Sequence, residues 1–416
     1  MLPRPSAGAF TAALAGLASA SPIQPMIKTF SVSQVANPYF KPHGPTQLAR
    51  TLIKYGAPIS DGLAHAVAEP DAHRIVTRDQ GTVSALPLSY DHAYISVVEI
   101  GTPPQPLNLA LDSGSSDLWV FSTETPLRQL SSQERYNATK SQTAKLEHGA
   151  YWRIRYGDRS YSNGIVYRDT VTLGGVTVKN QAVEVALNVS RQFTTDGDTD
   201  GLLGLGFKSV NQVRPKRENT WFDNAIETLD APVWTADLKY ERPGTYDFGF
   251  IDDTKYKGDL SYVDVDSSNG LWTINTSSYR IGNGTLRNVP FKAIADTGTS
   301  LALLPKDIVD DYYSTVTGAI HDKGWDGYTF PCTTTLPDFV LSIGEAIITI
   351  PSKYINYSAD NYNHTCYGGI QSDGQIGFSI LGDVFLKSAF VVFDATPDHP
   401  RLGLAEKELT FKRSLT

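Results

Sequence analysis

The chain has 416 residues, of which 41% are hydrophobic, 11% aromatic and 19% charged, with 34 glycines and 24 prolines. This composition excludes a disordered or collagen-like chain and is typical of a turn-rich globular β protein. The formal net charge of -8 makes nucleic acid an unfavourable partner, and two cysteines are too few for a disulfide-stapled scaffold or a cysteine zinc site.

The first 20 residues have the pattern of a secretory signal. Arg4 precedes an apolar, small-residue stretch over 7–18, and the stretch ends in Ala18-Ser19-Ala20. We expect residues 1–20 to be a signal peptide cleaved after Ala20; the alternative is a frayed apolar N-terminus on a cytosolic protein. Later apolar runs are shorter than the ~18 residues that span a bilayer, and the tail lacks the hydrophobic end of a lipid-anchor signal. The sequence therefore predicts a secreted, extracellular protein without a membrane anchor.

Asn-x-Ser/Thr acceptor sites weakly favour the same compartment and a glycoprotein. They begin at Asn137, Asn188, Asn275, Asn283, Asn356 and Asn363.

The charge changes sign near residue 80. Residues 21–83 contain six Lys/Arg, four Asp/Glu and three His, which gives +2, whereas residues 84–416 contain 29 Lys/Arg and 40 Asp/Glu, which gives -11. Opposite charges favour docking of the first segment on the second. We interpret residues 21–83 as a removable propeptide, with a boundary good to about five residues; the alternative is an ordinary basic arm.

Beyond residue 84 the sequence alternates short β-branched and aromatic runs with glycine, proline and asparagine turns. The clearest predicted strands cover 93–100, 107–111, 164–173 and 389–393. Helical periodicity is limited to short stretches at 221–229 and 306–316, the second of which follows a proline that suits a helix start. The pattern predicts a mostly β protein.

An internal repeat is more informative than the strand pattern. Leu109-Ala-Leu-Asp112-Ser-Gly-Ser-Ser116 is similar to Ala293-Ile-Ala-Asp296-Thr-Gly-Thr-Ser300, and each copy follows an apolar strand. An apolar-apolar-Gly triplet follows in each half, with its glycine 92 residues after Asp112 and 86 residues after Asp296. The repeat predicts two related halves that each contribute one Asp-x-Gly loop.

Two such loops have a defined chemistry if a two-fold axis brings them together. The amides and hydroxyls of each turn donate to the carboxylate, and two carboxylates at ~3 Å cannot both ionise, so they share one proton. The ionised partner activates a water as general base, while the protonated partner polarises a carbonyl. The pair therefore predicts amide hydrolysis without a covalent intermediate.

The motifs, in their order along the chain, resemble those of pepsin-family aspartic endopeptidases of the fungal, secreted type. They are Gly101-Thr-Pro-Pro104, Asp112-Ser-Gly-Ser-Ser-Asp-Leu-Trp119, Asp200-Gly-Leu-Leu-Gly204, Asp296-Thr-Gly-Thr-Ser300 and Ile380-Leu-Gly-Asp383. The resemblance implies an all-β, bilobal pepsin-like fold with lobes at 84–265 and 266–416 and the active-site cleft between them. It also implies protein and peptide substrates, with preference for bulky hydrophobic residues around the scissile bond, pepstatin-type inhibitors, a monomer, and neither metal nor cofactor.

The resemblance assigns roles to the residues of both loops. Asp112 and Asp296 would be the catalytic pair, supported by Gly114 and Gly298 in the turns. Ser115 and Thr299 would donate hydroxyls to the outer carboxylate oxygens, and Ser113 and Thr297 would make hydrogen bonds between the loops. Ser113 replaces the commoner threonine of the family, and it keeps the hydroxyl.

The segment Arg155-Tyr-Gly-Asp-Arg-Ser160 is similar to the flap that closes over substrate in this family. Tyr156 would bond to the indole of Trp119, and the amides of Gly157, Asp158 and Ser160 would bind the substrate backbone. Arg159 stands where the family usually has glycine, which alters the charge expected near the substrate.

Two further assignments also come from the resemblance. Cys332 and Cys366 would form the disulfide of the C-terminal lobe; the alternative is two reduced buried thiols. Lys54 and Tyr55 resemble the inhibitory part of family propeptides, in which Lys54 pairs with the catalytic carboxylates; the alternative is a surface lysine.

Three other classes of protein fit parts of the sequence. A sugar-kinase or actin-like ATPase also uses Asp-x-Gly-Thr loops, but it needs alternating strand-helix units that the sequence lacks. A catalytically silent pepsin-like binding or inhibitor protein usually loses a catalytic aspartate or the flap tyrosine, and this chain keeps all three. A glycosidase could also use two carboxylates, but its mechanism does not require the Asp-x-Gly turn to be duplicated.

Overall fold

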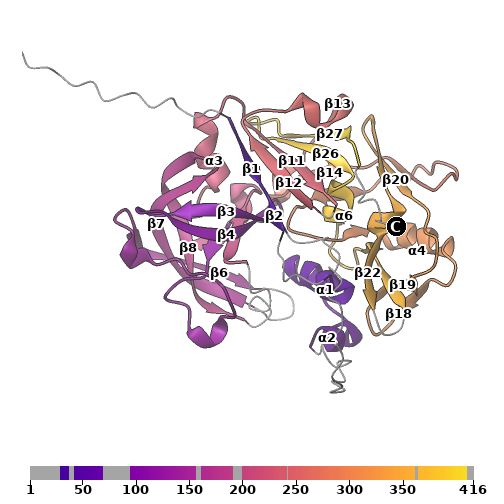
Figure 1. Cartoon of the computed structure of the whole chain (residues 1–416), viewed down its shortest axis with the longest axis horizontal. Coiled ribbons are helices and arrows are strands. Elements are labelled where there is room, and N and C mark those ends of the chain that lie inside the picture. Colours follow the sequence, from indigo (N-terminus) through magenta and orange to yellow (C-terminus); the bar gives the residue numbers. More distant parts are fainter. Residues whose placement is uncertain are drawn as a thin grey trace, which may run out of the picture.

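A computed structural model describes residues 29–36, 42–68, 94–155, 161–190, 199–240, 242–360 and 364–409. Strands dominate it, and two β lobes lie on either side of a central sheet (Figure 1). The predicted all-β, bilobal fold class is confirmed. The expected signal peptide lies outside the described residues.

The central sheet takes strands from distant parts of the chain. Its order is β1 (Phe30–Ser33), β12 (Arg242–Phe248), β11 (Val233–Lys239), β26 (Ala389–Asp394), β27 (Arg401–Glu406) and β13 (Lys257–Asp264). Trp234 on β11 stacks on Phe393 of β26 with ring centroids 3.8 Å apart. Burial of such large aromatic surfaces makes this sheet a common core for both lobes. Phe30 stacks on Phe248, so the segment before residue 84 supplies an edge strand of the sheet.

The N-terminal lobe is a nine-stranded sheet. Its order is β10 (Val213–Arg214), β6 (Lys145–Arg155), β7 (Tyr161–Leu173), β8 (Val176–Val189), β5 (Leu118–Val120), β9 (Gly201–Gly204), β4 (Gln105–Asp112), β3 (Tyr94–Ile100) and β2 (Val35–Ala36). A second cluster of buried apolar side chains, which includes Trp119 and Trp152, packs within this lobe.

Three smaller sheets form the C-terminal lobe. One contains β14 (Thr273–Asn275), β16 (Lys292–Ala295), β25 (Ser379–Leu381), β17 (Ala302–Leu304) and β24 (Ile370–Ser372). The second contains β15 (Ser278–Ile281), β20 (Phe339–Ile343) and β21 (Ala346–Ile350), and the third contains β18 (Ile320–Asp322), β19 (Gly327–Pro331), β23 (Thr365–Gly368) and β22 (Asn356–Asp360).

The internal repeat corresponds to a repeated strand arrangement. In the first half β9 pairs parallel with β4 and antiparallel with β5; in the second, β25 pairs in the same way with β16 and β17. A Cβ on Gly204 would lie 2.5 Å from the Ser116 Cα, and one on Gly382 would lie 2.3 Å from the Thr299 carbonyl. The repeated glycines therefore allow β9 and β25 to end directly against the two Asp-x-Gly loops.

The helices are short, and two of them lie before residue 84, where no helix was predicted. They are α3 (Trp221–Ala225), α4 (Lys306–Ser314), α5 (Ser352–Ile355) and α6 (Asp383–Leu386), together with α1 (Gly44–Lys54) and α2 (Asp61–Ala68). The stretch predicted at 221–229 continues from α3 into a 3-10 turn at Ile226–Thr228. No helix in the described part of the chain is long and apolar enough to cross a membrane.

Helices α1 and α2 lie between the two lobes on one side of the molecule (Figure 1). The His43 ring accepts a hydrogen bond from the backbone N–H of Thr46 and so caps α1, and a proline in the first turn preorganises the helix. The buried residues Leu48 and Leu52 share one face of α1 and join the main core. This packing directs the last helical residue, Lys54, toward Asp112 and Asp296.

Candidate active site

The two Asp-x-Gly loops meet at the centre of the molecule. Asp112 is the last residue of β4, Asp296 directly follows β16, and their exposed fractions are 1% and 0%. The loops are joined by reciprocal hydrogen bonds. The Ser113 amide donates to Thr297 Oγ1 at 3.0 Å, and the Thr297 amide donates to Ser113 Oγ at 2.9 Å.

The same hydroxyls also bond to backbone carbonyls of the opposite half. Ser113 Oγ donates to the Ala295 carbonyl at 2.8 Å, and Thr297 Oγ1 donates to the Leu111 carbonyl at 2.7 Å. The serine makes the bonds that a threonine would make, because they need only the hydroxyl. The structure thus brings Ser113 and Thr297 together as the sequence suggested.

Each carboxyl group is held by its own turn. The amide of Gly114 donates to Asp112 Oδ1 at 2.9 Å, and the Ser115 hydroxyl donates to Asp112 Oδ2 at 2.6 Å. In the other loop, Gly298 and Thr299 donate to Asp296 at 2.9 and 2.5 Å. These donors fix both side chains in one orientation before any substrate arrives.

The glycines of the two turns are required by the approach of the opposite aspartate. A Cβ on Gly114 would lie 2.5 Å from Asp296 Oδ1, and one on Gly298 would lie 2.2 Å from Asp112 Oδ1. Any larger residue would separate the carboxyl groups, so the glycine in each Asp-x-Gly loop is a condition for the shared site.

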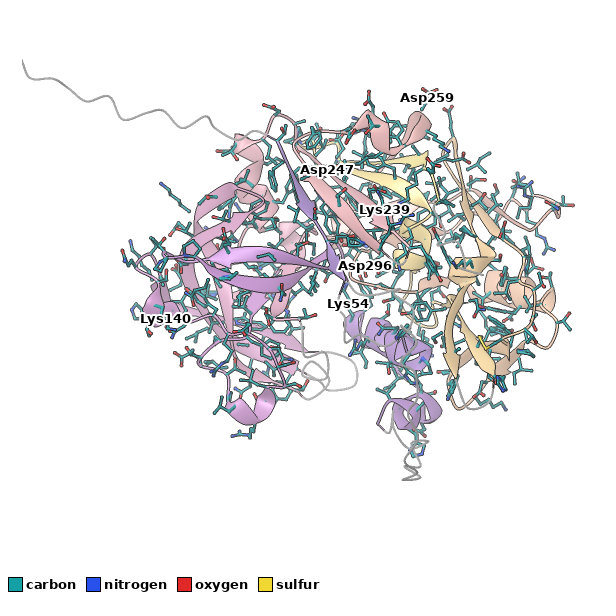
Figure 2. All side chains as sticks on the ribbon, in the orientation of Figure 1. Lys54, Lys140, Lys239, Asp247, Asp259 and Asp296 are labelled. Carbon is teal, nitrogen blue, oxygen red and sulfur yellow. A yellow bond between two sulfur atoms is a disulfide. The ribbon has the colours of Figure 1, made fainter. Side chains whose placement is uncertain are left out.

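Lys54 occupies the space between the two carboxyl groups. Its ammonium donates to Asp112 Oδ1 at 2.7 Å and to Asp296 Oδ1 and Oδ2 at 3.1 and 3.0 Å. The Tyr55 hydroxyl donates to Asp296 Oδ2 at 2.7 Å. Figure 2 shows Lys54 beside Asp296 at the centre of the molecule. Lys54 thus lies within the site, in contact with both carboxyl groups.

The electrostatics of the three groups follow from burial and proximity. Burial alone would raise the pKa of Asp296, but the Lys54 charge and several hydrogen bonds lower it to about 2. Burial and the charge of Asp296 raise the pKa of Asp112, and Lys54 offsets only part of this effect. Burial would lower the pKa of Lys54, yet the two carboxylates raise it above its usual value. In this state a cation neutralises the site.

Part of the predicted substrate-binding site lies outside the described residues, namely Tyr156, Gly157, Asp158 and Ser160. The strands that flank this segment, β6 and β7, pair up to Arg155 and Tyr161. Trp119, the expected partner of Tyr156, is buried and packs on Phe121 and Trp152.

The predicted disulfide is confirmed. Cys332 and Cys366 are bonded with Cα atoms 4.9 Å apart, which connects the end of β19 to β23. In the loop-entropy account, closing a loop of this length stabilises the fold by about 3 to 4 kcal/mol. No cluster of His, Cys, Asp and Glu suited to a metal ion occurs among the residues that the structure describes.

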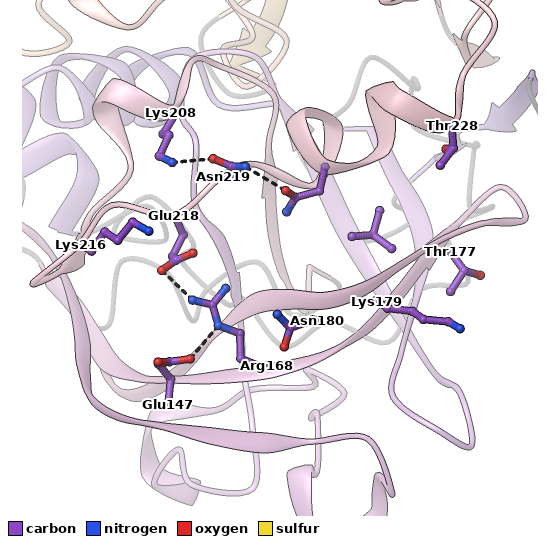
Figure 3. Close-up of a pocket in the computed structure, with 12 residues that line it drawn as sticks. Glu147, Arg168, Thr177, Lys179, Asn180, Lys208, Lys216, Glu218, Asn219 and Thr228 are labelled. Carbon is purple, nitrogen blue, oxygen red and sulfur yellow. Dashed lines mark hydrogen bonds and ion pairs between the residues drawn. The ribbon is translucent and has the colours of Figure 1, made fainter.

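A polar hollow lies elsewhere on the N-terminal lobe. Figure 3 shows Arg168 at its wall, ion-paired with Glu147 and Glu218 at 2.8 and 2.7 Å. Lys208 donates to Asn219 across the opposite wall. The hollow contains neither Asp112 nor Asp296, so it is separate from the site described above.

Comparison with known proteins identifies the family. A family model described as eukaryotic aspartyl protease matches residues 93–407. The chain belongs to the eukaryotic aspartyl protease family. The expected family and the predicted aspartic-type endopeptidase are both confirmed, and nothing in the comparisons favours a catalytically silent relative.

Fungal relatives match the protease over nearly its whole length. Endothiapepsin of Cryphonectria parasitica is 48% identical over 380 residues, which cover 91% of this chain and 90% of the relative. Podosporapepsin of Podospora anserina is 49% identical over 388 residues, covering 91% of both chains. Aspergillopepsin-1 of Aspergillus fumigatus is 44% identical over 402 residues, covering 95% of this chain and 98% of the relative.

Sequence reasoning missed one group of residues behind the Asp112 loop of the protease. Asp117, Glu184 and Asn211 are buried together, with exposed fractions of 3%, 1% and 1%. One signal was present in the sequence, because Glu184 interrupts the apolar run Ala182-Val-Glu-Val-Ala186. An acid in the middle of such a run indicates a buried carboxyl group.

Proposed function

We propose that Asp112 and Asp296 are the catalytic pair of a secreted acid endopeptidase. The observation that carries the proposal is two buried carboxyl groups, one from each half of the chain, that both bind a single ammonium group. When the ammonium leaves, the two acids share one proton and hold a water between them. The ionised aspartate takes a proton from this water, which attacks the peptide carbonyl while the protonated aspartate donates to the carbonyl oxygen.

We also propose that the full chain is a zymogen. Residues 1–20 would be the signal peptide, residues 21–83 the propeptide, and residues 84–265 and 266–416 the two lobes of a monomeric extracellular enzyme. Lys54 and Tyr55 support this proposal, since they occupy the space that the attacking water needs. Apolar packing of Leu48 and Leu52 on the main core holds α1 in this position.

The pH dependence of docking follows from the pKa of Asp296. In the docked state this pKa is lowered to about 2, in part by the charge of Lys54 and the hydrogen bond from Tyr55, from an ordinary aspartate value of about 4. A lowered pKa gives stability that is fully present above about pH 4 and is lost as the pH falls toward 2. Protonation of other carboxylates weakens the attraction between the segment of charge +2 and the remainder of charge -11 in the same pH range.

We therefore expect the full chain to be stable at pH 7 and to lose residues 21–83 when it is acidified to pH 3. N-terminal sequencing and mass spectrometry after timed acidification measure the loss. An active enzyme at pH 3 that still carries residues 21–83 would contradict the zymogen proposal.

The expected substrates are proteins and peptides with bulky hydrophobic residues beside the scissile bond. Burial of a large apolar side chain contributes about 1.5 to 3 kcal/mol, whereas a partly exposed ion pair contributes about 0 to 1 kcal/mol. The charges of Asp158 and Arg159 should therefore modify the preference without reversing it. Digestion of a peptide library at pH 4, with and without pepstatin, tests both substrate class and mechanism. Cleavage mainly at charged residues, or cleavage insensitive to pepstatin, would contradict the proposal.

A further inference from the structure

The group of Asp117, Glu184 and Asn211 lies directly behind the loop that carries Asp112. Asp117 precedes β5, Glu184 lies on β8, and Asn211 lies just before β10. Glu184 is the register partner of Trp119 in the parallel pair formed by β5 and β8. The proposed mechanism uses none of the three side chains.

Asn211 is the centre of the group, and its orientation is fixed by backbone donors. Its Oδ1 accepts from the amides of Val213 at 3.1 Å and Glu218 at 2.9 Å, so Nδ2 faces the two acids. Nδ2 lies 2.8 Å from Asp117 Oδ1 and 3.0 Å from Glu184 Oε1. It also lies 3.1 Å from the Ser116 carbonyl. Three acceptors thus converge on an amide that has two hydrogens.

The two carboxyl groups form a second acid pair. Oxygens that both contact Asn211 Nδ2 lie within about 6 Å of each other, a distance at which like charges disfavour joint ionisation. Within the described ranges, no Lys, Arg or His makes an ion pair with either acid, and Glu184 Oε2 is buried without a hydrogen-bond partner. If the two carboxyl groups hold one proton between them, only one negative charge is buried and the repulsion between them disappears.

Some of the charged groups around the pair disfavour ionisation of the two acids, and another favours it. The negative charges of Asp112 and Glu218 disfavour ionisation of Asp117 and Glu184 respectively, and the positive charge of Arg214 favours ionisation of Asp117. Burial is the largest influence, and it raises the pKa of Asp117 to about 6 and that of Glu184 well above its usual range.

Backbone contacts connect this acid pair to the catalytic loop. Asn211 binds the carbonyl of Ser116, and the Ser116 hydroxyl donates to the Phe207 carbonyl at 2.7 Å. The amide of Gly206 donates to the Ser115 carbonyl at 2.7 Å, and the Ser115 hydroxyl binds Asp112. A displacement of Asn211 or Asp117 would therefore move the donor that orients the Asp112 carboxyl group.

We propose that Asp117, Glu184 and Asn211 are positioning residues that hold the Asp112 loop in its working geometry only while the acid pair retains a proton. The proposal rests on the catalytic role proposed for Asp112. Because folding raises the pKa of both acids, the pair destabilises the loop progressively as the pH rises from about 4 through 6 and above. This second pair then sets the upper pH at which the enzyme keeps its active conformation.

The experiment compares Glu184→Gln with the wild type. Acid-activated enzyme is incubated for a fixed time at pH values from 4 to 9 and is then assayed at pH 4, so the titration of the catalytic pair does not enter the readout. A glutamine is neutral at every pH and can still donate toward Asp117. We expect activity at pH 4 within about threefold of wild type, a midpoint for activity loss at least one pH unit higher, and at least tenfold slower inactivation at pH 7.

Asp117→Asn removes the other carboxyl group and should shift the midpoint in the same direction. Glu345→Gln is the matched control, because Glu345 is exposed in the turn between β20 and β21 of the C-terminal lobe, and it should leave the midpoint unchanged. A purely structural role predicts lower midpoints for both acid variants. Unshifted or lowered midpoints, or failure of both isosteres to fold at pH 4, would overturn the proposal. A wild-type enzyme that shows no peptidase activity at pH 4, even before the incubation, would instead refute the proposed function.

Discussion

Asp112→Asn and Asp296→Asn are each expected to reduce peptidase activity at pH 4 by at least a thousandfold without unfolding the protein. An asparagine side chain has nearly the volume of aspartate, and its oxygen can still accept from the glycine amide of its own turn, as Asp112 does from Gly114. It cannot take a proton from water, so the general base or its protonated partner is lost. The measurement is kcat/KM on a quenched peptide.

The control for these two variants is Asp252→Asn. Asp252 caps a 3-10 turn on the surface and is distant in sequence from both Asp112 and Asp296. It should keep wild-type turnover. Fluorescence of the buried tryptophans and the thermal midpoint check that each variant is folded. Retention of a tenth of wild-type turnover in either purified dyad variant would refute the catalytic assignment.

The internal repeat predicted the two Asp-x-Gly loops correctly because the hydrogen bonds that hold each carboxyl group come from neighbouring residues in the sequence. A carboxylate at the end of a buried strand, followed by glycine and two hydroxyl residues, specifies its own hydrogen-bond donors, as Asp296 shows with Gly298 and Thr299. The glycines could be read as turn residues, but their close approach to the opposite aspartate is visible only in three dimensions.

The central sheet could not be predicted in the same way. β1 pairs with β12, and β11 pairs with β26, across more than 150 residues of sequence. Such pairing depends on packing, for example of Trp234 on Phe393, and not on a local pattern. The Asn211 group was missed for a similar reason, since its three members lie on separate segments of the chain and share no motif.

Lys54→Met is expected to release the inhibitory segment at a pH where the wild-type chain keeps it. The ammonium is the cation that pairs with Asp112 and Asp296, and removal of one partner from a buried ion pair costs about 3 to 5 kcal/mol, since the remaining charge stays unpaired. The methionine leaves two carboxyl groups against an apolar side chain, so docking now requires them to be protonated. The pH dependence of this contact therefore reverses, and docking is weakest near neutral pH.

We expect the shortened chain to form at least tenfold faster in Lys54→Met than in wild type at pH 5.5, measured by gel densitometry and by hydrolysis of a quenched peptide. Lys140→Met is the matched control, because Lys140 is exposed and far from the dyad (Figure 2), and its rate should equal that of wild type. Combining Lys54→Met with Asp112→Asn should abolish processing, which separates self-cleavage from attack by another protease. Equal rates for Lys54→Met and wild type would mean that the apolar face of α1, with Leu48 and Leu52, holds the segment without help from the ion pair.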